Sequence, residues 1–408
     1  MKTLLKLAWR NIWRNKRRTI ITVSSIFFAV LLALFMRSMQ LGSYSKMIID
    51  SVESYSGYIQ VHKAGYWEDK SINDLIELSD SLKNAIESVP HVKNAFPRLE
   101  TTGLAASEKL NKFSMIIGIN PEEEDKMTRL SEKIIEGKYL TSESNGVIIS
   151  SGLSNFLKLG VNDTIVFIGQ GYHGSTAVGK YPIEGIVKLA NPKMDKGMVY
   201  MPLQVCQTYS GAEKLGNAFI IVLDNFKYVP EVQATLKQGL GEKYEVMNWE
   251  EIQPELVQII LADNAGGVIM LGILYIVIAF GIFGTIMMMT IERLKEFGVL
   301  VAVGMHKSRL MIIVIIEALL IGIFGILISF GAGIPLLLIM QQYTIQLTGD
   351  AADGMLKMGI EPIIPFSLDP VIFYSQGLAI FLIVGICIIY PLFKIKFLNP
   401  IYAIKSHR

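Results

Sequence analysis

The stretch GSTAVGKY, residues 174–181, comes within one residue of a phosphate-binding loop. The full pattern is G-x-x-x-x-G-K followed by Ser or Thr, whose hydroxyl binds Mg²⁺ at the start of a helix. Here Tyr181 takes the hydroxyl position and Pro182 follows it. The residue before a proline disfavours the helical conformation. We therefore interpret the match as a coincidence and expect a glycine-rich turn between two strands.

The other reactive residues form no recognisable site. The five histidines lack metal-ligand spacing, and the two cysteines, Cys206 and Cys387, are expected on different sides of a membrane boundary. No nucleophile elbow, HExxH motif or carboxylate pair stands out in its required context. The basic residues lie beside apolar segments, which argues against a nucleic-acid surface. The sequence predicts no catalytic, cofactor or metal site in this chain.

The composition indicates a membrane protein. Of the 408 residues 51% are hydrophobic and only 18% are charged, whereas soluble proteins average about a quarter charged. Four continuous apolar stretches approach or reach the roughly 20 residues that a spanning helix needs, and they do not alternate as barrel strands would. The expected spans are residues 19–41, 264–290, 310–340 and 371–393. The first has a long basic lead and no small-x-small site, so we interpret it as an uncleaved anchor.

Lysine and arginine residues flank the spans on one side. Residues 1–18 hold seven of them and no acid, and residues 291–309 and 394–408 are also basic. These segments share a side if there are four spans, and the positive-inside rule places them in the cytoplasm. Residues 42–263 then form a large extracytoplasmic α+β domain between spans one and two, and residues 341–370 a short external loop. Gly174 lies in that domain, away from ATP.

The N-terminal segment is patterned. Its basic residues recur every fourth position from Lys2 to Arg14, with Trp9 and Trp13 on the other face. This predicts an amphipathic helix in the cytoplasmic interface, although a plain topogenic charge cluster is an alternative.

The external domain is expected to mix strands and helices. Strand-like runs recur throughout it, starting at residue 57. Helical periodicity predicts helices at residues 71–89, 152–159, 202–209 and 230–238, and residues 250–262 are expected to rise as a helix straight into span two.

The loop IERLKEFGVLVAVGMHKSRL, residues 291–310, is short and amphipathic. Gly298 and Gly304 would permit sharp turns at either end of a short helix. A docking helix for a cytoplasmic partner and an ordinary connector both fit this pattern.

This loop resembles the pattern E-R-x-x-E-(I/F)-G-x-L-x-A-x-G of permeases in the FtsX/MacB superfamily of ABC transporters. The matching residues are Glu292, Arg293, Glu296, Gly298, Leu300, Ala302 and Gly304. Val301 stands where the family often has a basic residue. NIWRNKRRT from Asn11 is similar to the opening N-x-x-R-x-x-x-R-T. YPLFKIKFLNPIYAI from Tyr390 is similar to the closing Y-P-x-x-x-A-x-x-x-x-P-x-x-A, with Ile395 replacing the first Ala.

Within the external domain, the run from His91 resembles the lipoprotein-releasing (LolC/LolE-like) branch, which has Pro-Arg, then strands, then G-I-(D/N)-P-E. The matching residues are Pro97, Arg98, Gly118, Ile119, Asn120, Pro121 and Glu122.

The resemblance implies a multi-pass permease of the bacterial inner membrane, with its large domain in the periplasm. Such a permease pairs with an identical or paralogous second permease and works with two copies of a cytoplasmic ABC ATPase. ATP and Mg²⁺ would bind to that ATPase, and movement of the loop would drive the external domain. In the Lol-like branch the substrate is a lipoprotein, which is extracted from the outer leaflet and passed to a periplasmic carrier. The alternatives are MacB-like efflux of peptides or small molecules with an adaptor, and FtsX-like activation of a cell-wall hydrolase. A membrane-bound enzyme is a further alternative, but no group of residues in the sequence forms a catalytic motif that supports it.

Two features of the spans bear on this mechanism. Gly325, Ser329 and Gly333 are four apart and form a face that lets another helix approach closely, with Gly281 and Thr285 as a shorter version in span two. Such residues also ease local packing.

Glu317 lies inside span three, where a charge at the bilayer centre costs about 2.5–3.5 kcal/mol. Two interpretations remain open: a buried polar contact that responds to movement of the loop, or a carboxylate that reaches towards Lys307 or Arg309.

Overall fold

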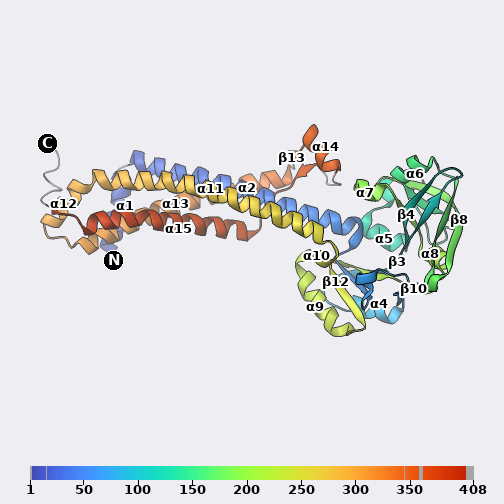
Figure 1. Ribbon diagram of the computed structural model, residues 1–408. Helices are drawn as coiled ribbons and strands as arrows, with labels where there is room; N and C mark the ends of the chain where they lie inside the picture. Colours follow the sequence, from blue (N-terminus) through green and yellow to red (C-terminus); the bar gives the residue numbers. More distant parts are fainter. Residues whose placement is uncertain (1, 15, 344, 358–361, 401–408) are drawn as a thin grey trace. The chain divides into compact units, whose positions relative to one another are not determined.

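The computed structural model describes residues 2–14, 16–343, 345–357 and 362–400 (Figure 1). The chain divides into two compact units. The membrane unit contains the described parts of residues 1–44, 259–346 and 363–408. The domain unit contains those of residues 45–258 and 347–362.

The membrane unit is built from helices. They are α1 (Lys2–Arg14), α2 (Lys16–Ser51), α11 (Pro254–Glu292), α12 (Leu294–Ala302), α13 (Lys307–Gln342) and α15 (Pro370–Lys396). Four of them, α2, α11, α13 and α15, are long and apolar enough to cross a membrane, which matches the four-span prediction. Between α13 and α15 the chain forms the paired strands β13 (Ile345–Gln346) and β14 (Ile363–Ile364) and the helix α14 (Asp350–Lys357).

The first two spanning helices are longer than the expected spans. α2 runs on past residue 41 to Ser51 and ends in a π-helical turn, Val52–Ser56. The straight rise expected for residues 250–262 is interrupted. α10 (Trp249–Ile252) ends at Gln253, because Pro254 disfavours a helical residue before it, and α11 begins at Pro254.

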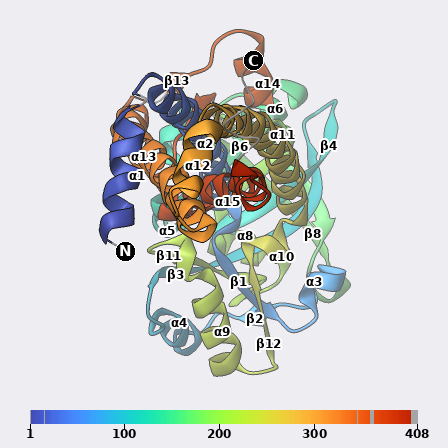
Figure 2. The ribbon, with the colours of Figure 1, turned by 90° about the vertical axis from the view of Figure 1, so that its left-hand side faces the viewer.

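The N-terminal helix α1 packs along α13 (Figure 2). Ala8 and Ile12 are buried, and the ring of Trp9 lies 5.5 Å from that of Phe324 in α13. The apolar face of α1 was predicted to lie in the membrane interface. At Ala8, Trp9 and Ile12 this face packs against the protein itself.

The domain unit is built on a ten-stranded mixed sheet. Its strands are β1 (Ile59–Lys63), β3 (Val92–Ala106), β4 (Asn111–Ile119), β5 (Ile134–Gly137), β6 (Val147–Ser150), β7 (Thr164–Gln170), β8 (Thr176–Val187), β9 (Met198–Pro202), β11 (Ala218–Leu223) and β12 (Tyr244–Asn248). The order is β12-β1-β11-β3-β4-β9-β6-β8-β5, and β7 pairs with β3 and β8. The long strand β3 therefore joins two halves: it pairs with β11 along its first part and with β7 along its last.

Short helices cover this sheet. They are α3 (Tyr66–Asp69), α4 (Asp80–Glu87), α5 (Pro121–Thr128), α6 (Ser151–Leu157), α7 (Pro192–Asp195), α8 (Leu203–Ser210) and α9 (Val229–Leu240). Three of these, α6, α8 and α9, lie within two residues of their predicted positions.

The prediction of a helix at residues 71–89 is wrong for the first half of that segment. There the chain forms β2 (Ile76–Glu77), which pairs with β10 (Leu215–Gly216). The helix α4 starts only at Asp80, where the Ser79 side chain accepts a hydrogen bond from the backbone N–H of Leu82. Strand pairing with a distant segment overrides the helical periodicity, and the cap marks the true start.

The stretch GSTAVGKY has the conformation of a turn followed by a strand. Gly174, with φ 76°, ends the turn Tyr172–Gly174 between β7 and β8. Lys180 and Tyr181 lie within β8. A phosphate-binding loop needs a helix at this point, so the geometry agrees with the interpretation of a chance match.

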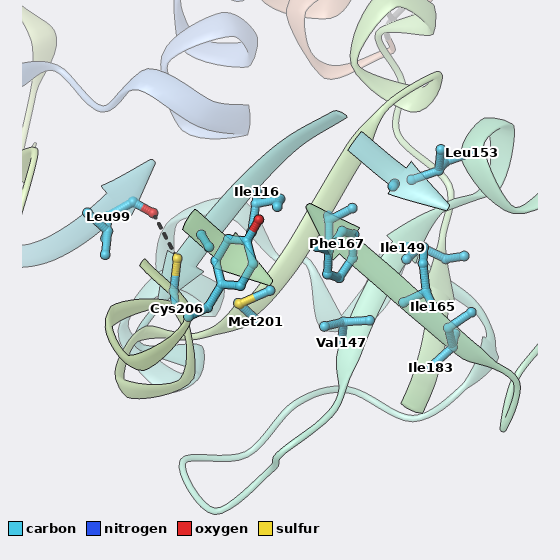
Figure 3. Packing of buried hydrophobic residues seen from close by; sticks show 14 of the residues in the cluster. Leu99, Ile116, Val147, Ile149, Leu153, Ile165, Phe167, Ile183, Met201 and Cys206 are labelled. Carbon is cyan, nitrogen blue, oxygen red and sulfur yellow. Dashed lines mark hydrogen bonds between the residues drawn. The ribbon is translucent and has the colours of Figure 1, made fainter. Parts of the chain in front are cut away.

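The largest apolar core of the domain lies between the sheet and α6 and α8 (Figure 3). It includes Leu99, Phe167 and Cys206, all of them buried. The Cys206 thiol lies 3.7 Å from the backbone oxygen of Leu99, and burial raises its pKa to about 12. It is therefore a packing residue that stays protonated.

Candidate coupling site

Three helices bring the residues of the predicted coupling loop together. α11 ends at Glu292, Arg293 stands at the bend, and α12 begins at Leu294. The helix α12 turns its Phe297 inward, where Phe297 packs with Leu310 and Val314 of α13 and with Ile395 of α15. The loop is thus a short helix anchored on spans three and four.

The carboxylate of Glu317 is the centre of the polar contacts. Glu317 is 5% exposed and Arg293 is 8% exposed. Arg293 donates a hydrogen bond of 2.5 Å to one oxygen of Glu317, and the Asn11 amide donates one of 2.6 Å to the other. The single carboxylate therefore connects α1, the bend before α12, and α13.

The contacts of Glu317 bear on the two interpretations of this residue, and its response to movement of the loop stays a prediction. The carboxylate is held by Arg293 and Asn11, whereas Lys307 donates to the backbone oxygen of Lys396 at 3.2 Å. Glu317 is therefore a buried polar contact of the loop, and the alternative of a carboxylate reaching towards Lys307 or Arg309 is wrong.

Two further ion pairs join the N-terminal segment to the loop. Arg14 pairs with Glu296, and Arg18 pairs with Glu292. The guanidinium of Arg293 also lies 3.6 Å from Glu296. These outer pairs are partly solvated, and each is expected to contribute about 0–1 kcal/mol.

Sequence reasoning missed the N-terminal residues of this site. Asn11, Arg14 and Arg18 were treated as topogenic charges or family landmarks, yet each one contacts the loop or Glu317. Thr19, the last position of the opening motif, donates to the backbone oxygen of Ile12 at 2.8 Å. The signal was the motif N-x-x-R-x-x-x-R-T itself, whose four specified positions are these residues.

The buried pair is closely packed. The Arg293 guanidinium lies 5.3 Å from the centroid of the Phe297 ring, in cation–π geometry. A cavity of about 30 Å³ adjoins the pair, lined among others by Thr22 and Thr290. Removing one member of a buried ion pair costs several kcal/mol, so Arg293 and Glu317 are expected to move together when α12 moves.

The two glycines of the loop have different roles. Gly298 is buried in the middle of α12, so the expectation that it bends one end of the helix is wrong. Gly304 has φ 103° and follows the end of α12, as a turn requires. Leu300 and Ala302 are exposed, as are Val299 and Val303, and they give α12 an uncovered apolar face.

The small face of span three receives the first spanning helix of the same chain. A side chain at Gly325 would collide with Ile26 of α2, and Gly333 lies against Leu34. The hydroxyl of Ser329 donates to the backbone oxygen of Gly325 at 2.6 Å.

The small residues of span two, Gly281 and Thr285, have different surroundings from those of span three. Among the described residues beyond the adjoining turns of its own helix, no atom lies within 4 Å of a Cβ placed at Gly281. Thr285 donates to the backbone oxygen of Gly281 at 2.9 Å.

The residues of the external motif belong to the domain unit. Arg98 is 1% exposed and donates to both carboxylate oxygens of Glu124, at 2.7 and 3.0 Å, and to the backbone oxygen of Tyr55 at 2.7 Å. It therefore ties the π-helical turn after α2 to β3 and α5. This explains the motif as a structural anchor.

The rest of the motif shapes the elements around Arg98. Pro97 lies just outside the β3–β4 ladder, whose first pair is Arg98 with Ile119, and stands opposite Phe219 in the β3–β11 ladder. Asn120 precedes α5 and Pro121 opens it, the helix position that proline favours. A side chain at Gly118 would collide with Cys206.

Family models match most of the chain. The model of the MacB-like periplasmic core domain matches residues 19–238, and the model of the FtsX-like permease C-terminal region matches residues 268–400. The first match alone covers more than half of the chain.

Individual relatives are distant. The chain is 21% identical over 255 residues to the lipoprotein-releasing system transmembrane protein LolC of Xylella fastidiosa, covering 60% of this chain and 61% of that protein. It is 24% identical over 255 residues to a putative hemin transport system permease protein HrtB of Staphylococcus haemolyticus, covering 58% and 67%. The match to LolC thus spans less than two thirds of its length.

A solved structure of the periplasmic region of MacB from Actinobacillus actinomycetemcomitans covers 52% of this chain and 97% of that chain, with 13% identity and a TM-score of 0.37.

Proposed function

The chain belongs to the FtsX/MacB family of ABC transporter permeases, and on this premise we propose that it couples ATP hydrolysis by a separate ATPase to movement of its periplasmic domain. It is a multi-pass inner-membrane protein with a large α+β domain between its first two spans. The observation that carries the proposal is the buried contact of Glu317 with Arg293 and Asn11, because it joins the loop helix to two other helices.

The proposed route of force begins at α12. Its exposed apolar face, which includes Val299, Leu300 and Val303, offers a docking surface for a cytoplasmic ATPase. A push on α12 is passed through Arg293 to Glu317 in α13 and to Asn11 in α1. α2 and α11 are the helices that enter the external domain, so their movement would reach it. ATP and Mg²⁺ would bind to two copies of the ATPase.

For the substrate we propose a lipoprotein, extracted from the outer leaflet of the inner membrane and passed to a periplasmic carrier. The Gly-Ile-Asn-Pro-Glu run at residues 118–122 and the likeness to LolC support this choice. The second permease of the complex is either identical or a paralogue. The likeness to HrtB favours an alternative, transport of a small molecule such as hemin. MacB-like efflux with an adaptor and activation of a cell-wall hydrolase are further alternatives.

The test is to trap the complex with its cargo. The full chain is expressed with its ATPase carrying a substitution that blocks hydrolysis, and the complex is purified and analysed by mass spectrometry for lipidated proteins. We expect lipoproteins on the trapped complex and few on the hydrolysing complex, which serves as the control. Hemin or free peptides in their place would support the alternatives and reject the lipoprotein proposal.

A further inference from the structure

The domain unit contains a large cavity at a break in the sheet. Strand β3 pairs with β11 up to Arg98 and with β7 from Gly103 onwards. Residues 99–102 of β3 therefore pair with neither of these two strands. A cavity of about 910 Å³ lies at this junction. Pockets of about 300–1,000 Å³ are typical of small-ligand sites in proteins. Nothing in the coupling mechanism uses this space.

One wall of the cavity is polar, and most of its groups are already bonded to one another. His62 has the backbone oxygen of Asn217 and the side-chain oxygen of Gln60 within 2.9 Å of its two ring nitrogens. The Asn217 amide donates to the Tyr66 hydroxyl at 2.9 Å. Because the Tyr66 oxygen accepts that bond, its own proton is free to point at a ligand. Burial raises the pKa of Tyr66, so it keeps this proton.

Another part of the cavity lining, with Leu104, Phe113 and Ile168, is apolar and continues beyond the cavity. Leu104 in β3 is the direct cross-strand partner of Phe113 in β4 and of Ile168 in β7, and Ile168 is the partner of Val178 in β8. Cross-strand partners share one face of a sheet, so these four residues form an apolar row across four strands. Phe113 is 69% exposed, Ile168 47% and Val178 58%. Three spacings of about 4.8 Å make the row roughly 14 Å long.

The neighbouring residues argue against other ligands. β7 and β11 are each paired on both sides, and the part of β3 that pairs with neither of them, residues 99–102, is only four residues long, so a peptide cannot add itself as a strand. Among the described lining residues the only Lys or Arg is Lys70, which sits 4.0 Å above the Trp67 ring. With Asp69 and Glu100 also lining the cavity, the site lacks the cation cluster that a phosphate group needs.

We propose that this cavity binds a long acyl chain along the row Phe113–Leu104–Ile168–Val178, with an ester carbonyl of the ligand accepting a hydrogen bond from Tyr66. Thr102, on the same face of β3 as Leu104, offers a second hydroxyl. The inference rests on the proposed function for its source of acyl chains, the lipid anchor of a lipoprotein. It adds a holding site in the periplasmic domain, outside the membrane.

The cavity also touches both entrances of the domain. Tyr55, in the π-helical turn after α2, and Gln253, directly before α11, line it. Gln253 accepts a hydrogen bond from Ser51 and donates one of 2.7 Å to Ser56. A bound chain would therefore contact the segments through which movement enters the domain.

The test uses Trp67, which lines the cavity, as a reporter. The full chain, with its other three tryptophans, Trp9, Trp13 and Trp249, replaced by Phe, is placed in lipid nanodiscs and titrated with a synthetic diacylated lipopeptide that carries bromine on its acyl chains. We expect saturable quenching of tryptophan fluorescence, absent with the same peptide lacking acyl chains. Ile168→Glu is expected to weaken binding about tenfold or more, as loss of one buried aliphatic side chain predicts.

Ile135→Glu is the matched control, because Ile135 is also exposed on a strand, β5, but does not line the cavity. Phe113→Ser tests the same row if Ile168→Glu fails to fold. Quenching that is equal in Ile168→Glu and Ile135→Glu, or absent from the parent protein, overturns the proposal. A brominated free fatty acid forms a second arm. If it alone quenches with the same dependence on Ile168, the site stands and its source is not a lipoprotein anchor. The trapping experiment judges lipoprotein transport separately.

Discussion

Replacing Glu317 tests the coupling site most directly. Glu317→Gln keeps the shape of the side chain but removes its charge. Among the described residues Arg293 then keeps only Glu296, 3.6 Å away, as a charged partner and stays buried. The amide can accept from Arg293 or from Asn11 through its oxygen, but its NH₂ group then faces the other donor. Loss of one partner from a buried ion pair costs about 3–5 kcal/mol. Because one hydrogen bond survives, we expect about 3 kcal/mol of destabilisation here.

The functional measurement is ATP hydrolysis and substrate release by the complex in proteoliposomes. If half of the lost energy belonged to the link between α12 and α13, stimulation of the ATPase would fall about tenfold, since 1.4 kcal/mol corresponds to a factor of ten. Glu296→Gln is the control. Its partner Arg14 is about half exposed, so a change of about 0–1 kcal/mol and near-normal coupling are expected.

A double variant separates stability from coupling. Replacing both members of a buried ion pair by apolar residues is often neutral for stability. Arg293→Met with Glu317→Met should therefore recover most of the thermal stability that either single change loses, while coupling stays impaired because the specific link is gone. Normal coupling in Glu317→Gln, or full recovery of coupling in the double variant, would refute the assignment of Glu317 to the force route and leave it a packing role.

Three further predictions concern other parts of the chain. Arg98→Met should destabilise the external domain by about 3–5 kcal/mol, because Glu124 stays buried without its cation; limited proteolysis of the full chain should then cut this domain first, and resistance equal to the wild type would contradict this. Gly325→Val should cost about 1–3 kcal/mol through overpacking against α2, measured as a lower melting temperature, whereas Gly331→Val, with open space around it, should stay within about 1 kcal/mol. Burial raises the pKa of Asp195, but hydrogen bonds from Lys188, the Leu189 N–H and Ser151 outweigh it and hold that pKa below its usual value. A depressed pKa stabilises the fold above the unfolded-state value of about 3.9 and loses this effect as pH falls through the folded-state value. The stability gap between wild type and Asp195→Asn should therefore be widest near neutral pH and narrow below about pH 4, and a constant gap would reject this account.

The spans and the layout could be predicted from the sequence because they depend on local properties. Length and apolarity decide whether a helix can cross a membrane, and basic flanks decide its orientation. The helices α6, α8 and α9 were found for the same reason, since their periodicity and their Gly or Pro limits lie within the segment itself. The error at residues 71–89 came from the pairing of β2 with β10, a partner more than a hundred positions away.

The loop residues were recognised as a motif, but the motif alone could not say what they touch. The sequence by itself determined the four apolar helices, the large inserted domain and the family landmarks, because each is written in a short stretch of chain. Only the tertiary structure decided that Glu317 is bonded to Arg293 and Asn11, that Arg98 anchors the turn after α2, and that Leu104, Phe113, Ile168 and Val178 share one row. Most of those contacts join residues that are far apart in the chain, up to 306 positions for Asn11 and Glu317. Their partners are fixed by helix packing and strand register, which no local pattern encodes.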